Sequence, residues 1–152
     1  QGFLLDENYG FHPHTTWSTT TPKNAREVLN EAGVENVTTY GCLRSYATRH
    51  GAGPLYHEGE LDKHIPEPHN SSDGIQGAFR TAPHAMSMVD WAIKTAEVDL
   101  LSIGHVDVFD GLMTDEGLID LDSLSRPVAI RGYGPNRENR CFAPNNKEGY
   151  KE

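Results

Sequence analysis

The residues best suited to bind a ligand lie at positions 49–54, which read Arg-His-Gly-Ala-Gly-Pro. The two glycines lack a Cβ atom, so the backbone can turn sharply and approach a ligand closely, and the proline prevents strand pairing from continuing. Arg49 and His50 stand at the edge of this turn, where we expect their side chains to suit an anionic or nucleotide ligand. A tight turn that only ends a strand is the alternative for so short a string.

A long loop is predicted at residues 6–21, which are rich in turn formers and hydroxyl groups. His12 and His14 have the His-x-His spacing of a metal pair, but no third ligand follows at a recognisable spacing, so a metal site is disfavoured. The hydroxyl groups can instead receive a phosphate, although loops carry hydroxyls for ordinary reasons as well. His and Glu side chains also gather over residues 56–73, where two prolines favour an extended, solvated loop over a metal site.

Asp107 comes shortly after a predicted buried strand at residues 98–103. A carboxylate at such a position can accept hydrogen bonds from both the N1–H and the exocyclic amino group of guanine, a pair of donors that adenine lacks. The choice between the two bases would then depend on this one residue.

The elements that must position these residues alternate between helices and strands. Helices are predicted at residues 22–32, with Thr21 as a cap and Gly33 at the end, and at residues 83–97. Besides the strand at 98–103, strands are predicted at 37–48 and 127–131. The apolar residues at helical spacing are Ala25, Val28, Leu29 and Ala32 in the first helix and Met86, Val89, Ile93 and Ala96 in the second. This order predicts an α/β fold with a mostly parallel sheet, flanking helices and ligand loops at the C-terminal ends of the strands.

Composition limits the classes of function. The 152 residues suit one soluble domain, with 36% apolar and 23% charged residues and a loop-rich 15 Gly and nine Pro. A net charge of -9 argues against a surface dedicated to nucleic acid or to anionic membrane. Cys42 and Cys141 are the only cysteines, and no signal peptide or membrane-spanning run is recognised, so a reducing cytoplasm is expected. The chain lacks an initiator Met and begins at what resembles a strand end, which predicts a fragment.

Five motifs, in order along the chain, resemble the adenylosuccinate synthetase family. They are Gln-Gly-x-Leu-Leu-Asp at 1–6, Gly-x-x-Pro-x-x-Thr at 10–16, the string at 49–54, Gly-His-Val-Asp-Val-Phe-Asp-Gly-Leu at 104–112 and Gly-Tyr-Gly-Pro-Asn-Arg at 132–137. The resemblance implies the C-terminal part of a synthetase domain over residues 1–137, with part of a P-loop-NTPase-like synthetase fold and a polar tail at 138–152. Residues 113–126 are expected to be an acidic surface connection, where the family often carries a longer insertion.

The implied activity is a ligase reaction that joins L-aspartate to IMP at the expense of GTP. The GTP γ-phosphate is transferred to the purine O6, and the aspartate amine then displaces that phosphate. The catalytic groups and the Mg²⁺ ligands of the family lie in its N-terminal half and have no counterpart here, so we expect no catalytic residue, no metal ligand and no turnover by this chain alone. The family also implies a homodimer.

The resemblance assigns three groups of binding residues. Those for the purine nucleotide are Gln1, Thr16, Arg49, His50 and Gly51. Those for aspartate are Ser72, Gly74, Gln76 and Arg80. Those for the base of the triphosphate are His105, Asp107, Gly132, Tyr133 and Gly134.

Several alternatives stay open at this point. His105 replaces a lysine of the family that packs on the base, which leaves ATP as an alternative to GTP. His12, His14 and His105 also leave open the phage-type relative, which joins aspartate to dGMP. A non-catalytic nucleotide-binding module is a third possibility, and for Arg80 a salt bridge on the outer surface is the alternative.

Overall fold

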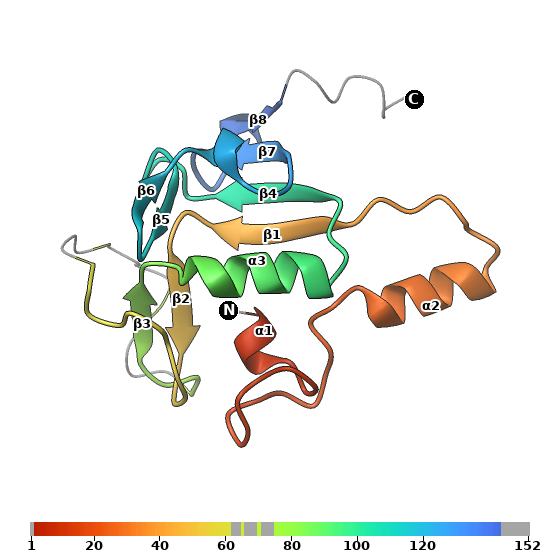
Figure 1. Cartoon of the computed structure of the whole chain (residues 1–152), viewed down its shortest axis with the longest axis horizontal. Helices are drawn as coiled ribbons and strands as arrows, with labels where there is room; N and C mark the ends of the chain where they lie inside the picture. The colour runs from red at the N-terminus through yellow and green to blue at the C-terminus, as the bar shows by residue number, and fades with distance from the viewer. Residues whose placement is uncertain (1, 62–64, 66–69, 71–74, 144–152) are drawn as a thin grey trace. The chain divides into compact units, whose positions relative to one another are not determined.

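The computed structural model describes residues 2–61, 65, 70 and 75–143 (Figure 1). The chain forms two compact units, each made of two separate stretches of sequence. Unit 1 comprises Gln1–Val37 and Ala47–Ala85, and unit 2 comprises Thr38–Tyr46 and Met86–Glu152. None of the helices in the described part of the chain is both long and apolar enough to cross a bilayer.

Unit 2 contains a four-stranded, mostly parallel sheet, as the sequence predicts. Its order is β1 (Tyr40–Arg44), β4 (Leu100–Gly104), β7 (Val128–Gly132) and β8 (Arg140–Phe142), which Figure 1 shows one above the other. The pairs β1–β4 and β4–β7 are parallel, and β8 is antiparallel to β7. Because β1, β4 and β7 run in the same direction, their C-terminal ends meet at one edge of the sheet.

The core of unit 2 includes residues of this sheet and of helix α3 (Met86–Thr95). Val89 and Ile93 are buried as predicted, because their spacing places them on one face of the helix, and Ala96, directly after the helix, is buried too. Met86, predicted for the same face, is only half-buried. The helix is shorter than the predicted 83–97. Its N-terminus is held by Asp115, whose Oδ1 accepts a hydrogen bond from the Met86 amide at 2.9 Å.

The single strand predicted at residues 37–48 is wrong. Residues 40–44 form β1 in unit 2, whereas β2 (Ala47–His50) pairs antiparallel with β3 (Phe79–Ala82) in unit 1. Ser45 and Tyr46 separate the two strands, and both are buried. Cys42, in the middle of β1, is exposed.

Unit 1 begins with a short helix, α1 (Gly2–Leu5), where the sequence suggested a strand end. A loop without regular structure follows, as predicted for residues 6–21, and leads into α2 (Lys23–Glu31). Pro22 is the residue before this helix, and Thr21 Oγ1 accepts a hydrogen bond from the Lys23 amide at 3.4 Å. None of the α2 residues is buried in the described structure, and Val28 in its apolar stripe is 64% exposed.

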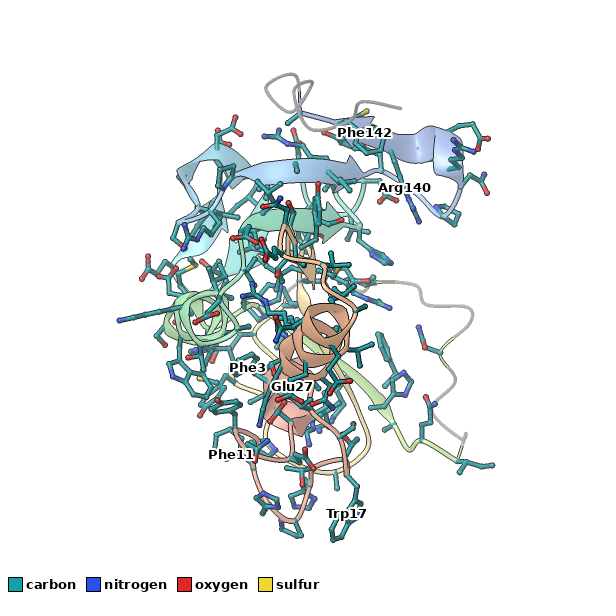
Figure 2. The ribbon with its side chains drawn as sticks, turned by 90° about the vertical axis from the view of Figure 1, so that its right-hand side faces the viewer. Phe3, Phe11, Trp17, Glu27, Arg140 and Phe142 are labelled. Carbon is teal, nitrogen blue, oxygen red and sulfur yellow. The ribbon has the colours of Figure 1, made fainter. Side chains whose placement is uncertain are left out.

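Two segments that were expected to be irregular contain regular structure. The surface connection predicted at 113–126 includes the antiparallel hairpin of β5 (Leu112–Thr114) and β6 (Gly117–Ile119) and the short helix η1 (Leu121–Ser123). The polar tail predicted from residue 138 includes the end of η2 (Arg137–Asn139) and β8. Phe142, on β8, is an exposed side chain of this edge strand (Figure 2).

Candidate functional site

The glycine turn at residues 51–53 is built around a buried arginine. Arg49 is only 1% exposed, so it does not stand at the edge of the turn as predicted. Its Nη2 donates hydrogen bonds to the carbonyls of His14 (2.9 Å) and Ala52 (3.1 Å), and its Nε donates to Ala52 O (3.2 Å). Gly53 leaves room for this guanidinium, because a Cβ atom there would lie 2.3 Å from Arg49 Nη2.

Arg80 holds the same turn from strand β3. Arg49 and Arg80 face each other in the β2–β3 register, and Arg80 Nη2 donates to the carbonyls of Gly51 (2.6 Å) and Gly53 (2.8 Å). Its Nη1 donates to Glu58 Oε2 at 2.7 Å, so the salt bridge considered for Arg80 is present together with the contacts to the turn. Burial lowers the pKa of Arg49, and the neighbouring Arg80 guanidinium lowers it further.

Three buried nitrogens of this cluster have no hydrogen-bond partner among the described residues. They are Arg49 Nη1, His50 Nδ1 and Arg80 Nε. His50 is held by its other nitrogen, Nε2, which lies 3.1 Å from Asn70 Oδ1, and by the ring of Phe79, whose centroid is 4.9 Å away. Since a buried donor without a partner is costly, Arg49 Nη1 and Arg80 Nε are suited to an anionic or carbonyl-bearing ligand. His50 Nε2 donates to the Asn70 oxygen, so Nδ1 of a neutral imidazole is an acceptor that suits an N–H or O–H group of a ligand.

The turn also contacts the segment predicted to bind aspartate. Gly51 has φ 69°, and a Cβ atom on it would lie 2.7 Å from the carbonyl oxygen of Gln76. The amide of Gly51 donates to Ala78 O at 3.0 Å. The structure therefore brings together Arg49, His50, Gly51, Gln76 and Arg80, which come from two of the predicted groups. Gln1, Ser72 and Gly74, also predicted for these groups, lie outside the described residues.

Thr16, the remaining residue predicted for the purine nucleotide, lies on the loop of residues 6–21. Its hydroxyl donates to Leu5 O at 3.2 Å and lies 3.0 Å from Ser18 Oγ, and its side chain is exposed. Trp17 beside it projects from the loop and is 98% exposed (Figure 2). The loop reaches the arginine cluster through His14, whose carbonyl accepts from Arg49.

A buried carboxylate that sequence reasoning did not single out fixes this loop. Asp6 is fully buried, and its Oδ1 accepts from the amides of Asn8 (2.8 Å) and Tyr9 (3.2 Å). Its Oδ2 accepts from the amide (2.6 Å) and hydroxyl (3.1 Å) of Thr20 and from Thr19 Oγ1 (3.1 Å). Burial on its own raises the pKa of Asp6, but these hydrogen bonds outweigh it and lower the pKa below its ordinary value.

The second cluster lies in unit 2, where β4 and β7 end side by side. His105 and Asp107 follow β4, and residues 132–134 end β7 and continue beyond it. The amide of Val106 donates to Gly132 O at 2.9 Å, which joins the two segments. All five residues predicted for the triphosphate base are thus near one edge of the sheet, and the Asp107 carboxylate is exposed.

His105 has an unusual backbone conformation, with φ 61°. Part of its ring is unavailable for stacking on a base, because the ring packs edge-on against Tyr46, with ring centroids 5.7 Å apart. Ser45 Oγ donates to the carbonyl of His105 at 2.6 Å. The sequence did not single out Ser45, since no motif identifies a serine whose hydroxyl group bonds to a carbonyl 60 residues away.

Among the described residues, no group of three or more His, Cys, Asp or Glu side chains could hold a metal ion. His12 has other partners, with Nε2 lying 2.9 Å from Glu7 O and Nδ1 3.1 Å from Thr15 Oγ1. His57 Nδ1 lies 3.2 Å from Glu60 Oε2. His64, Glu67 and His69 lie outside the described residues.

The comparisons with family models and with curated proteins point to the same family. The family model described as adenylosuccinate synthetase matches residues 1–115. Adenylosuccinate synthetases from Xylella fastidiosa (strain 9a5c) and Stenotrophomonas maltophilia (strain R551-3) are 30% and 31% identical over 158 and 160 aligned residues. Both alignments cover 100% of this chain and 33% of the relative, so the chain spans about a third of the length of the curated relatives it matches.

Solved structures of the same kind share the fold. Fully ligated adenylosuccinate synthetase from Plasmodium falciparum superposes with a TM-score of 0.66 at 18% identity, over 93% of this chain and 48% of that one. The succinoaminodeoxyadenylate synthetase (PurZ) of cyanophage S-2L, bound to dGMP and to dATP as an energy donor, gives 0.64 at 16% identity, over 95% and 45%. The two scores are too similar for the fold to separate these proteins.

Proposed function

Because this chain belongs to the adenylosuccinate synthetase family, we propose that it is the C-terminal, substrate-binding part of a ligase that joins L-aspartate to IMP and consumes GTP. The chemistry requires the purine O6 to become a better leaving group, which its phosphorylation by the triphosphate achieves. The amine of aspartate then forms the new C–N bond and displaces phosphate. The share of this chain in the reaction is to bind and orient the substrates.

The observation that carries this proposal is the set of unpartnered nitrogens around the glycine turn. Arg49 Nη1, His50 Nδ1 and Arg80 Nε are buried and have no partner among the described residues, and all three belong to residues assigned to substrates on sequence grounds. A nucleotide and a dicarboxylic amino acid both offer anionic oxygens that satisfy the two arginine nitrogens, and both carry N–H or O–H groups that can donate to His50 Nδ1. Binding would thus remove an energetic cost that the free chain carries.

Mg²⁺ is expected for a nucleoside triphosphate substrate. The described residues of this chain offer no group of three or more His, Cys, Asp or Glu side chains that could hold it. We therefore assign no step of the reaction to a metal held by this chain.

The proposed function is tested by expressing the longest reading frame that contains these residues and following aspartate-dependent phosphate release. IMP and dGMP are each paired with GTP and with ATP. Turnover with IMP and GTP is the expected result. If no pair supports turnover, the ligase proposal is wrong and a nucleotide-binding module is the better description.

Asp107→Asn is the first variant to measure in that assay. We expect kcat/KM for GTP to fall about 100-fold, because an amide cannot replace a carboxylate that accepts two hydrogen bonds from guanine. The matched control is Asp110→Asn, which changes another exposed carboxylate three residues further along the chain. Equal effects of the two variants would mean that Asp107 does not read the base.

A second candidate reaction uses dGMP in place of IMP. It is favoured by the three histidines, His12, His14 and His105, at positions where the family has other residues. The same assay separates the candidates, since dGMP carries a 2-amino group and lacks the ribose 2′-hydroxyl. A kcat/KM for dGMP above that for IMP would replace the first proposal with this one.

A further inference from the structure

The turn at residues 105–107 is held in place by contacts from distant parts of unit 2. His105 has φ 61°, a conformation that is unfavourable for a residue with a Cβ atom and persists only where the surroundings impose it. Its carbonyl accepts hydrogen bonds from Ser45 Oγ (2.6 Å) and from the amide of Val108 (3.0 Å). The next amide, that of Val106, donates to Gly132 O.

Ser45 links three segments of the chain at this turn: its own segment after β1, the end of β4 and strand β5. Its side chain is 0% exposed. Its amide donates to Gly104 O at 2.8 Å, and its own carbonyl accepts from the Met113 amide at 2.7 Å. The backbone of Ser45 is therefore held at both its amide and its carbonyl. Its hydroxyl group donates to the carbonyl of His105, the first residue of the turn that contains Asp107.

The residue after Ser45 supports the same turn by packing. Tyr46 is 1% exposed, and its ring contacts the ring of His105 edge-on. It also contacts Phe109, with ring centroids 6.0 Å apart. The backbone and the side chain of His105 are thus both held from the short segment that separates β1 from β2.

We propose that Ser45 is a positioning residue that fixes the turn at residues 105–107 and thereby sets the selectivity for the base of the nucleoside triphosphate. This inference rests on the proposed function, because it takes Asp107 as the residue that reads the base. A carboxylate discriminates between guanine and adenine only if its two oxygens keep their place relative to the base, so loosening the turn weakens discrimination more than it weakens binding.

The test uses the 152-residue chain and its Ser45→Ala variant, with dissociation constants for GTP, ATP and IMP measured by calorimetry. We expect the ratio of the ATP constant to the GTP constant to fall about fivefold, the value of one net hydrogen bond, while the IMP constant is unchanged. Ser123→Ala is the matched control, because Ser123 Oγ donates to the Asp120 carbonyl at the same 2.6 Å within unit 2. This control should leave all three constants unchanged.

A second measurement does not depend on any nucleotide. In Ser45→Ala the amides of Val106 and Val108 should exchange with solvent about fivefold faster than in the wild-type chain, and they should not do so in Ser123→Ala. Ser45→Cys, which keeps the size of the side chain but donates weakly, should change exchange in the same direction and serves if the alanine variant does not fold.

The outcomes separate the two proposals. Unchanged exchange at Val106 and Val108 in the Ser45 variants overturns the role of Ser45, whatever the chain binds. Faster exchange with an unchanged GTP preference also overturns it, as does an equal loss of affinity for all three nucleotides. A wild-type chain that binds GTP and ATP equally would instead contradict base reading by Asp107, and with it the GTP preference in the proposed function.

Discussion

At the scale of single residues, the polar groups of unit 1 are more deeply buried than their types suggest. Asp6 accepts five hydrogen bonds, and the guanidiniums of Arg49 and Arg80 donate to all three carbonyls of the turn at 51–53. These side chains support backbone that has no regular secondary structure. A loop held in this way can present ligand-binding groups in a fixed arrangement.

Asp6→Asn tests this support at one residue. The variant should lower the free energy of unfolding by about 2–3 kcal/mol at pH 7, since an amide cannot accept all five hydrogen bonds. The pKa of Asp6 is lowered in the folded chain, so the unfolded chain binds the proton more tightly. Its stabilising contribution is therefore complete above about pH 5 and is lost as the pH falls through about 3.9 and then through the lower folded pKa.

Urea denaturation of the wild-type chain and of Asp6→Asn between pH 3 and 7 measures this difference. Glu7→Gln, at the exposed neighbouring position, is the control and should behave as the wild-type chain does. A gap between wild type and Asp6→Asn that widens toward acid would contradict the lowered pKa.

At the scale of elements, the hairpin of β5 and β6 determines where α3 begins. Asp115, at the tip of the hairpin, accepts a hydrogen bond from the amide of Met86, the first residue of the helix. Pro83, His84 and Ala85 were predicted to be helical, but they are buried before the helix starts. A contact between elements thus sets a boundary that helix propensity alone places three residues earlier.

Asp115→Ala should destabilise the chain by about 1 kcal/mol, because the amides at the start of α3 lose a capping acceptor. Asp115→Asn retains an acceptor oxygen and should recover most of that loss. Thermal unfolding followed by circular dichroism measures both. If the two variants are equally destabilised, the capping role of Asp115 is wrong.

At the scale of the whole molecule, the predicted substrate groups are divided between the two units. The described residues assigned to the purine nucleotide and to aspartate lie in unit 1, and those assigned to the triphosphate base lie in unit 2. If these assignments hold, each ligand should stabilise its own unit by mass action.

Hydrogen exchange of the chain with saturating IMP or GTP tests this division. At tenfold excess over the dissociation constant, IMP should slow exchange in β2 and at residues 14–16 about tenfold, and GTP should do so at residues 104–107 and 132–134. The chain in the same buffer without ligand is the reference. Protection of unit 1 by GTP and of unit 2 by IMP would reverse the assignment of the sites.

Features that depend on local geometry could be predicted from the sequence. Gly51 and Gly53 have the positive φ values expected of a glycine turn, and Val89 and Ile93 are buried at the spacing of one helix face. The parallel sheet followed from the alternation of strands and helices. The family motifs added the assignment of residues to substrates, most of which stays a prediction.

Features that depend on distant partners could not be predicted from the sequence, because their contacts form only in the folded chain. The sequence predicts one strand at residues 37–48. However, the backbone of Ser45 bonds to Gly104 and Met113, β1 ends before it, and Ala47 starts a strand in another unit. Arg49 is buried because Gly53 and the carbonyl of His14 make room and supply an acceptor. Periodicity shows which positions can be buried together, but the hydrogen-bond partners that fix the sheet to which a strand belongs are distant in the sequence: Gly104 and Met113 lie 59 and 68 residues after Ser45.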